Sequence, residues 1–456
     1  MGNPVFRRKI YKEILEWKEE RSEKYALLIK GARRVGKSTI VEEFAKKEFK
    51  SYILIDFAHT SKEITGLFDD MYNLDFFFLQ LQQFTRVRLY EKESVIIFDE
   101  VQLFPRARQA IKYLVADGRY KYIETGSLLS IKKNTRDILI PSEEHKISMY
   151  PMDFEEFMIA NNVSKTTLEM LKAKFETCQP VDEFIHQKLL SLFFIYLIVG
   201  GMPDAVKIYI ATKDIREVDK VQRDIVALYK EDFSQYESED KKLKLISIYD
   251  IIPAELNKQN KKFVFTMLNK ELKFDRYENS FLWLKDAGVA LPVYNVEAPV
   301  IPLKASKSSN VFRLFSNDTG LLTSAYPAET KLELINKNSE VNNGAHFENA
   351  VAQQLTANGL EPYFCKKKNI GELDVLVEMD GKVVPIEVKY GKAYKAHKSL
   401  DNFMKISDYH IEKAYVLSVA NMEQEGSVVY LPIYMCYLLK ERKIGKLIVD
   451  LDMEGL

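Results

Sequence analysis

Short apolar runs alternate with amphipathic stretches along the first 160 residues of the chain. Four of these runs predict strands, at residues 25–29, 52–56, 94–99 and 120–124. The segments between them carry apolar residues at helical spacing. Strands that alternate with helices in this way are typical of a parallel sheet covered by helices on both faces, which places this part of the chain in the α/β class.

The pattern changes after residue 160. Residues 161–240 predict helices with one break at Gly200–Pro203, because Gly-Gly-Met-Pro cannot continue a helix. Residues 241–335 predict three helices, the third at 275–287, and then a β-hairpin formed by 289–296 and 311–315. Three helices followed by a hairpin describe a winged helix. Basic and acidic residues are mixed on its third helix, so DNA binding and protein docking remain equally open.

The last part of the chain, residues 340–456, begins with a predicted helix at 344–358 and continues into strands. Two of these strands, 371–377 and 383–389, are separated by a turn at Gly381. This order indicates a second α/β unit that follows the helical middle.

Composition narrows the class of protein. Lys and Arg total 66, as do Asp and Glu, so net charge does not indicate a nucleic-acid binder. The three cysteines lie far apart and exclude a disulfide framework, which favours a reducing compartment. The first eight residues do not have the apolar core expected of a signal peptide, and the most apolar stretch, Leu192–Val199, is shorter than the roughly 20 residues that span a bilayer. We therefore expect a cytoplasmic protein with no membrane partner.

A phosphate-binding loop follows the first predicted strand and matches G-x-x-x-x-G-K-[ST]. Its nucleotide-binding candidates are Gly31, Ala32, Arg33, Arg34, Val35, Gly36, Lys37, Ser38 and Thr39. The glycines allow backbone N–H groups to wrap the phosphates, and the following helix adds its positive N-terminal dipole. Lys37 is expected to reach the β- and γ-phosphates of ATP, and the Ser38 hydroxyl to ligate Mg²⁺.

The strand at 94–99 ends in two acids, the Walker B arrangement. Asp99 is predicted to help hold Mg²⁺ and Glu100 to polarise the attacking water as a general base. Thr125 and Ser127 follow the next strand, where a polar side chain could sense the γ-phosphate; an ordinary turn is the alternative. Three arginines after the Walker B strand are weaker candidates for an arginine finger: Arg106, Arg108 and Arg119.

A second acidic group lies near the C-terminus. Asp374 and Glu387 fall on neighbouring strands of a predicted hairpin, and Glu348 lies on the preceding helix. Close carboxylates repel unless a cation lies between them, so this set predicts a Mg²⁺ or Mn²⁺ site. Lys389 shares a strand face with Glu387 and could orient a metal-activated water. A surface hairpin with alternating charges is the plain alternative, and active cleavage stays open even if the fold is nuclease-like.

These elements together resemble a prokaryotic family of AAA-type ATPases that have an AAA_14 domain followed by a DUF4143 domain. Beyond the two nucleotide motifs, the resemblance rests on Tyr150–Phe157, Gly200–Pro203, Asn317–Leu322 and the C-terminal acidic set. One departure concerns Glu143–Ser148, where the family often has a Gly-Arg pair. If that arginine contributes to catalysis in relatives, the resemblance does not extend that contribution to this chain.

The resemblance implies an AAA-type P-loop domain at 1–160, a helical connector at 161–240, a winged-helix-like domain at 241–335, and a PD-(D/E)xK, restriction-endonuclease-like α/β domain at 340–456. It also implies that Lys37, Ser38, Asp99 and Glu100 serve nucleotide and Mg²⁺. The leading hypothesis is an ATPase that controls a DNA-facing nuclease-like module. The alternatives are a switch that acts through protein contacts and a module that binds nucleotide without hydrolysis. Oligomeric state stays open, with a homo-oligomer among the options.

Overall fold

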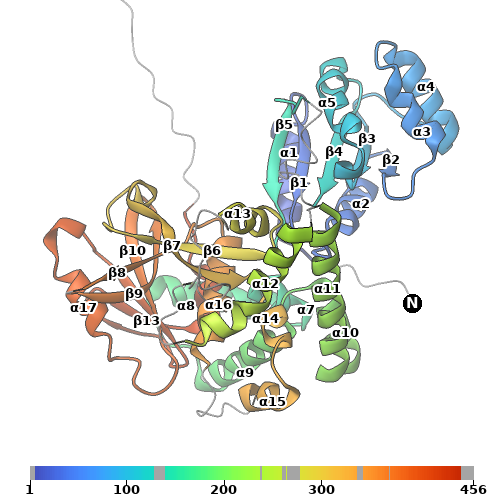
Figure 1. Cartoon of the computed structure of the whole chain (residues 1–456). Helices are drawn as coiled ribbons and strands as arrows, with labels where there is room; N and C mark the ends of the chain where they lie inside the picture. The colour runs from blue at the N-terminus through green and yellow to red at the C-terminus, as the bar shows by residue number, and fades with distance from the viewer. Residues whose placement is uncertain are drawn as a thin grey trace, which may run out of the picture.

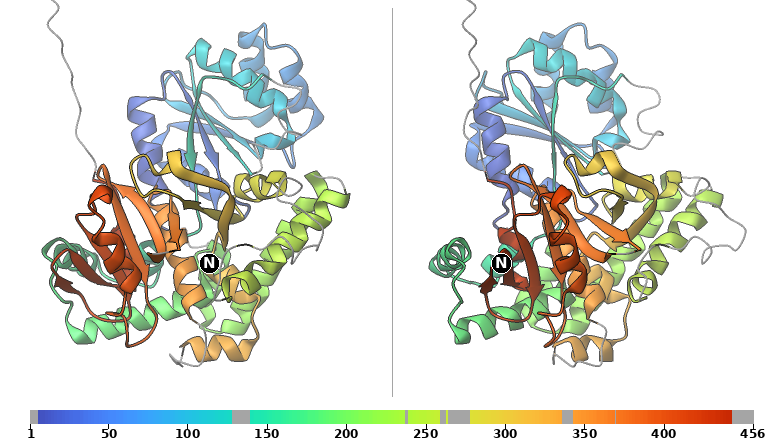
Figure 2. Two further views of the ribbon diagram at one scale, coloured as in Figure 1. Left: turned by 60° about the vertical axis from the view of Figure 1, so that its left-hand side comes forward. Right: turned by 90° about the vertical axis from the view of Figure 1, so that its left-hand side faces the viewer.

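Figure 1 shows the computed structural model of the chain, which describes residues 6–127, 139–236, 239–258, 263, 278–335, 343–368 and 370–442. Two β-sheets, one near each end of the chain, are separated in space. The helices of the middle region pack along the C-terminal sheet and reach the end of the N-terminal sheet (Figure 2).

The N-terminal sheet is parallel throughout. Its strands are β1 (Ala26–Lys30), β2 (Ser51–Asp56), β3 (Ser94–Asp99), β4 (Lys121–Gly126) and β5 (Glu144–Ser148), in the order β2-β3-β4-β1-β5. The four predicted strands and their parallel arrangement are confirmed. The edge strand β5 was not predicted, because only Ile147 of its five residues is buried and the others read as polar loop.

Helices cover both faces of this sheet. They are α1 (Ile10–Glu20), α2 (Lys37–Glu48), α3 (Lys62–Gly66), α4 (Leu74–Thr85) and α5 (Pro105–Asp117). Successive strand residues alternate between the faces. Leu27 and Ile97 pack with α1 and α2, whereas Leu28 and Phe98 pack with α4 and α5. The carboxyl ends of β1, β3 and β4 therefore meet at one edge, where the two nucleotide motifs lie.

The middle region is helical, as predicted. Its helices are α7 (Phe154–Ala160), α8 (Lys165–Thr177), α9 (Glu183–Val199), α10 (Pro203–Thr212), α11 (Ile215–Tyr236), α12 (Glu239–Leu256), α13 (Glu278–Asp286), α14 (Thr319–Ser324) and α15 (Ala328–Ile335). The predicted break is confirmed, since α9 ends at Val199 and α10 begins at Pro203. Proline is well tolerated there because the first helical N–H has no partner in its own helix.

The C-terminal sheet is mixed and has the order β12-β13-β11-β10-β9-β8-β6-β7. Its strands are β6 (Ala290–Val296), β7 (Lys307–Ser316), β8 (Tyr363–Lys367), β9 (Gly371–Met379), β10 (Lys382–Val388), β11 (Ala414–Ser418), β12 (Glu423–Glu425) and β13 (Val428–Pro432). Helices α16 (Gly344–Ala357) and α17 (Lys398–Met404) belong to the same region. The predicted helix at 344–358 and the antiparallel pair β9–β10 are confirmed.

The predicted hairpin at 289–315 forms as the antiparallel pair β6–β7, but it does not stand alone. Strand β6 also pairs in parallel with β8, through Tyr294 and Tyr363, so the hairpin extends the C-terminal sheet. The second helix of the predicted winged helix and the start of the third lie outside the described residues, apart from Phe263. The winged helix therefore stays a prediction.

Three segments far apart in sequence meet between the two sheets, and we call this meeting point the joint. They are Tyr150–Phe157, Gly200–Pro203 and Asn317–Leu322, the stretches that carry the family resemblance. The Met152 amide donates to the Gly201 carbonyl (2.7 Å), and the Gly201 amide donates to Asp318 Oδ2 (2.6 Å). A Cβ on Gly201 would lie 1.9 Å from the Met152 carbonyl oxygen, so only glycine permits this approach.

Asp318 is fully buried at the joint. Its Oδ1 accepts the Leu321 amide (3.0 Å) and caps α14. Burial raises the pKa of Asp318 to about 6, and hydrogen bonds from backbone amides, first that of Gly201, limit the rise. The ionised carboxylate is thus tolerated because backbone donors surround it.

We expect Gly201→Ala to lower the melting temperature markedly, because Met152 and Gly201 must move apart to admit the methyl group. Gly66→Ala is the matched control, since a Cβ there has nothing within 4 Å. Thermal unfolding of the two variants checks this prediction. Equal melting temperatures would show that the joint does not need the close approach.

The raised pKa of Asp318 makes stability depend on pH. Because the folded-state pKa lies above the ordinary value of 3.8, the stability associated with the protonated acid is present below about pH 4 and is lost as pH rises through about 6. Over this window, we expect wild type to lose about 1–3 kcal/mol more unfolding free energy than Asp318→Asn. Denaturant titrations at several pH values measure the slopes, and parallel slopes would contradict the expectation.

Candidate functional site

The phosphate-binding loop connects β1 to α2. Gly36 precedes α2 with φ 97°, a left-handed conformation that favours glycine. Lys37 is buried, and its Nζ donates to the carbonyl oxygens of Gly31 and Ala32, both at 3.0 Å. The ammonium group is therefore held at the concave side of the loop, where the sequence places the phosphates.

The Walker B acid lies directly beside this loop. Ser38 Oγ is 3.0 Å from Asp99 Oδ1, and the Thr125 hydroxyl donates to the same carboxylate oxygen. These hard oxygen donors suit Mg²⁺, so the residues fit the cation that ATP requires. Glu100 follows with φ 53° and accepts a hydrogen bond from the Gln102 side chain. The fold thus brings together the predicted residues Lys37, Ser38, Asp99 and Thr125.

Burial and the neighbouring carboxylates have opposite effects on the charge of Lys37. Burial lowers the pKa of Lys37, and the carboxylates of Glu100 and Asp99 oppose that effect. Negative phosphates would add to this opposition and keep the ammonium charged. Of the predicted γ-phosphate sensors, Thr125 contacts Asp99 directly, and Ser127 lines a pocket beside Arg33.

Sequence patterns do not reveal the contacts that hold the loop from outside. The buried Arg8 donates to the carbonyl oxygens of Val35 (2.8 Å) and Tyr150 (2.7 Å), and its Nε lies 3.1 Å from Glu156. This one guanidinium connects the phosphate-binding loop to the joint. An arginine close to a terminus carries no pattern that would mark it as such a link.

The three arginines proposed as fingers all have carboxylate partners within the chain. Arg108 forms a buried pair with Glu144 (2.7 Å), Arg119 pairs with Asp117, and Arg106 pairs with Asp69. Glu144 belongs to the edge strand β5. A buried structural pair explains Arg108 without a catalytic role.

The C-terminal acidic residues lie close together, as the hairpin register predicts. Val375 faces Ile386, which puts Asp374 and Glu387 side by side on β9 and β10. Asp374 Oδ2 accepts the Val388 amide (3.0 Å), and Lys389 Nζ is 2.7 Å from Glu387 Oε1. Burial, together with the charge of Asp374, raises the pKa of Glu387 to about 7. Its other oxygen is buried without a hydrogen-bond partner.

An arginine that the sequence did not single out also enters this cluster. Arg313 of β7 is 1% exposed, and its Nη1 lies 3.5 Å from Glu348 Oε2 and 3.1 Å from the Asp374 carbonyl oxygen. Its Nη2 pairs with Glu372, and its guanidinium lies over the Phe364 ring. A divalent cation prefers oxygen ligands that no other cation holds.

As arranged, the C-terminal residues do not fit a divalent cation, since Arg313 and Lys389 already neutralise two of the three carboxylates. In the described part of the chain, no three His, Cys, Asp or Glu side chains are grouped to hold a metal ion. The predicted metal set Glu348, Asp374 and Glu387 therefore stays a prediction that this geometry does not favour. We derive no reaction step through such a metal.

A glycine-rich loop between β1 and α2, an acid at the end of β3 and a parallel sheet of this strand order define a P-loop ATPase fold. An AAA-domain model matches residues 23–158, a model of the domain of unknown function DUF8612 matches 190–332, and one of the domain of unknown function DUF4143 matches 343–436. The chain therefore contains an AAA domain followed by a DUF4143 domain, the arrangement that the motifs predict.

Comparison with solved structures finds low similarity. The Walker-type ATPase PABY2304 of Pyrococcus abyssi is 16% identical with a TM-score of 0.44, covering 70% of this chain and 96% of its own. The Aeropyrum pernix Orc1 protein in complex with DNA is 11% identical, TM-score 0.30, covering 73% and 93%. The S. cerevisiae Hsp104–ADP complex is 12% identical, TM-score 0.27, covering 78% and 43%. These TM-scores carry no argument about function. No curated protein matches the chain.

In the described part of the chain, none of the helices combines the length and apolar character that a membrane crossing requires.

We expect Lys37→Ala to abolish Mg·ATP binding, because it removes the cation that the loop holds beside the phosphates. Lys47→Ala serves as a control: this exposed lysine of the same helix lies 3.6 Å from Glu43. Isothermal titration calorimetry measures both. Unchanged affinity in Lys37→Ala would refute the assignment of the phosphate-binding loop.

Proposed function

We propose that the protein is a Mg²⁺-dependent ATPase that works as a switch: the nucleotide state of the AAA domain is passed to the C-terminal half through the joint. The observation that supports this most strongly is a set of buried and part-buried hydrogen bonds that links the phosphate-binding loop, through Arg8 and the Tyr150–Phe157 segment, to α16. Buried polar contacts of this kind are costly to break singly, so the segments they join tend to move together.

The path starts at Arg8, which contacts both the phosphate-binding loop and Tyr150. From the same segment, Asp153 accepts a hydrogen bond from Gln354 of α16 (3.2 Å), and the Phe154 amide donates to Gln354 (3.2 Å). The adjacent Gln353 accepts the Thr319 amide (2.8 Å) of the joint. Helix α16 thereby receives contacts from the AAA domain and from α14.

The same helix carries Glu348 into the C-terminal acidic cluster. Ten buried residues surround Glu348 along α16, so the helix transmits displacement as a rigid body rather than absorbing it. A shift of α16 would change the distance between Glu348 and Arg313. The C-terminal cluster is therefore placed to respond to nucleotide.

In the ATPase reaction, Lys37 binds the phosphates, Ser38 and Asp99 hold Mg²⁺, and Glu100 orients the attacking water. Mg²⁺ held by Ser38 and Asp99 would supply positive charge to the phosphate oxygens. Thr125 fixes the orientation of the Asp99 carboxylate by donating to it, and Gln102 does the same for Glu100.

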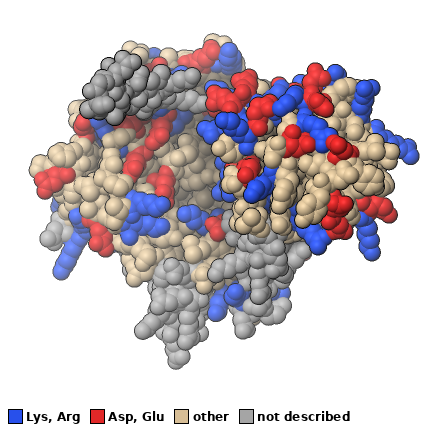
Figure 3. Space-filling model, turned by 90° about the horizontal axis from the view of Figure 1, so that it is seen from above, with Lys and Arg blue, Asp and Glu red and all other residues tan. Residues whose placement is uncertain are grey.

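A DNA-facing nuclease-like domain is the second candidate function, favoured by the gathering of Asp374, Glu387 and Lys389 on one hairpin. Two observations weigh against it. Arg313 already pairs with Glu348, one of the carboxylates that a divalent cation would need. On the face shown in Figure 3, Lys and Arg are interspersed with Asp and Glu, without the broad basic stripe that DNA backbone binding uses.

The switch predicts that exchange of α16 amides with deuterium differs between ATP-bound and ADP-bound protein. Glu100→Gln should bind ATP but hydrolyse it at least about 100-fold more slowly than wild type. The ATP-bound state then persists long enough for the measurement. We expect a change of exchange rate in α16 and the joint of trapped Glu100→Gln relative to the ADP complex of wild type. Lys37→Ala, mixed with ATP, is the control that should show no response.

Identical exchange in both nucleotide states would contradict the switch. Hydrolysis in Glu100→Gln at the wild-type rate would instead contradict the role of Glu100. A cleavage assay on duplex, single-stranded and branched DNA, with Mg²⁺ or Mn²⁺, separates the second candidate. Metal-dependent cutting that is lost in Asp374→Ala would support the nuclease function instead of the switch.

A further inference from the structure

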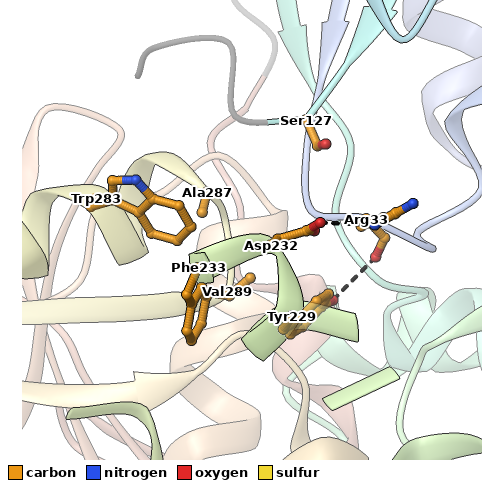
Figure 4. A pocket seen from close by; sticks show the side chains of 8 residues that line it. All are labelled: Arg33, Ser127, Tyr229, Asp232, Phe233, Trp283, Ala287 and Val289. Carbon is orange, nitrogen blue, oxygen red and sulfur yellow. Dashed lines mark hydrogen bonds and ion pairs between the residues drawn. The ribbon is translucent and has the colours of Figure 1, made fainter. Parts of the chain in front are cut away.

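A pocket between the phosphate-binding loop and the middle region contains an ion pair that the ATPase chemistry does not explain. Arg33, the third residue of the loop, places Nη1 2.8 Å from Asp232 Oδ1 on α11 (Figure 4). The hydroxyl of Tyr229, one helical turn earlier, donates to the Arg33 carbonyl oxygen (3.2 Å). Helix α11 thus holds both the side chain and the backbone of this one loop residue.

The pair lies in a pocket that residues from both the AAA domain and the middle region line. Ser127, which follows β4, lines the same pocket, and so do Phe233 and Trp283 from the middle region (Figure 4). Burial raises the pKa of Asp232, Arg33 lowers it, and the negative charge of Glu100 raises it again. Asp232 is therefore close enough to feel the Walker B carboxylate.

A guanidinium group binds carboxylates and phosphates through the same planar pair of N–H donors. The Arg33 side chain is 44% exposed, whereas that of Asp232 is 10% exposed, so the arginine is the partner that is free to turn. A terminal phosphate at this side of the loop would attract Arg33 and repel Asp232. The two anions would then compete for one cation.

We propose that Arg33 and Asp232 form a latch that the γ-phosphate opens: Arg33 pairs with Asp232 when the terminal phosphate is absent and turns to the phosphate when a nucleoside triphosphate binds. Asp232 is then a positioning residue that makes the loop discriminate triphosphate from diphosphate. This inference rests on the proposed ATPase function and names how the AAA domain signals its nucleotide state.

Separation of Arg33 from Asp232 would also weaken the attachment of α11 to the joint. The Tyr229 hydroxyl accepts a hydrogen bond from Asn317 Nδ2 (3.5 Å), and Asn317 adjoins the buried Asp318. Because binding and conformation are linked reciprocally, a state that frees Arg33 must bind triphosphate more tightly. The Arg33–Asp232 pair therefore weakens triphosphate binding, because the γ-phosphate must first draw Arg33 away from Asp232.

The test compares the affinities of a non-hydrolysable ATP analogue and of ADP by calorimetry. Asp232→Asn should bind the analogue about 3- to 10-fold more tightly and leave ADP affinity within about 2-fold. Arg33→Gln should lose the preference for the analogue over ADP. The matched control is Asp204→Asn, whose carboxylate pairs with the next loop residue, Arg34, at 3.5 Å on the surface and should change neither affinity.

Deuterium exchange of α11 supplies a second readout that does not depend on affinity. The ATP analogue should speed exchange in wild type, and Asp232→Asn should show the faster exchange with ADP as well. An equal change in affinity for both ligands, or none for either, would overturn the latch. If wild type binds neither nucleotide, the proposed ATPase function fails instead, so the two failures are distinguishable.

Discussion

The arrangement of the chain depends on the hydrogen bonds that the buried Asp318 side chain accepts. The carboxylate accepts amides from Gly201 and Leu321, and so ties the start of α10 to the start of α14. An unpaired buried carboxylate would cost several kcal/mol, and this cost falls on any arrangement that separates the two segments. Gly201 in turn lies against Met152 of the AAA domain. Through these hydrogen bonds the Asp318 side chain helps to set how the AAA domain, the helical middle and the C-terminal sheet meet.

The phosphate-binding loop and the joint are connected by two different routes. Arg8 reaches from the loop to the Tyr150 segment, and Tyr229 reaches from the loop to Asn317. Both routes consist of buried or half-buried polar contacts. In the proposed switch, a change at the loop would reach the joint from two sides, which would favour a two-state response over a gradual deformation.

Electrostatic compensation distinguishes the two acidic sites of the molecule. At the Walker B strand, Ser38, Thr125 and Asp99 present oxygen atoms without a cationic side chain between them, an arrangement that a hard cation can complete. In the C-terminal cluster, Arg313 and Lys389 pair with two of the three carboxylates from within the chain. Similar sets of carboxylates can thus have different roles, depending on whether a metal ion or a basic side chain of the protein neutralises them.

The sequence by itself determined the parallel sheet, the phosphate-binding loop, the Walker B strand and the helical break at Gly200–Pro203, because each depends on residues that are neighbours in sequence or share a short period. It also predicted that Asp374 and Glu387 lie side by side, since strand alternation and a short turn set that register. The polar edge strand β5 escaped prediction, because one buried residue in five leaves almost no pattern.

Only the tertiary structure determined which charged and polar groups from distant parts of the sequence come into contact. Arg313 reaches Glu348, Asp232 reaches Arg33, and Asp318 reaches Gly201. Local pattern does not encode such contacts, because a lone arginine or aspartate has the same sequence signature on a solvated surface as in a buried pair. The physical reason is that the free energy of a charge depends on its surroundings, and packing of the whole chain creates those surroundings.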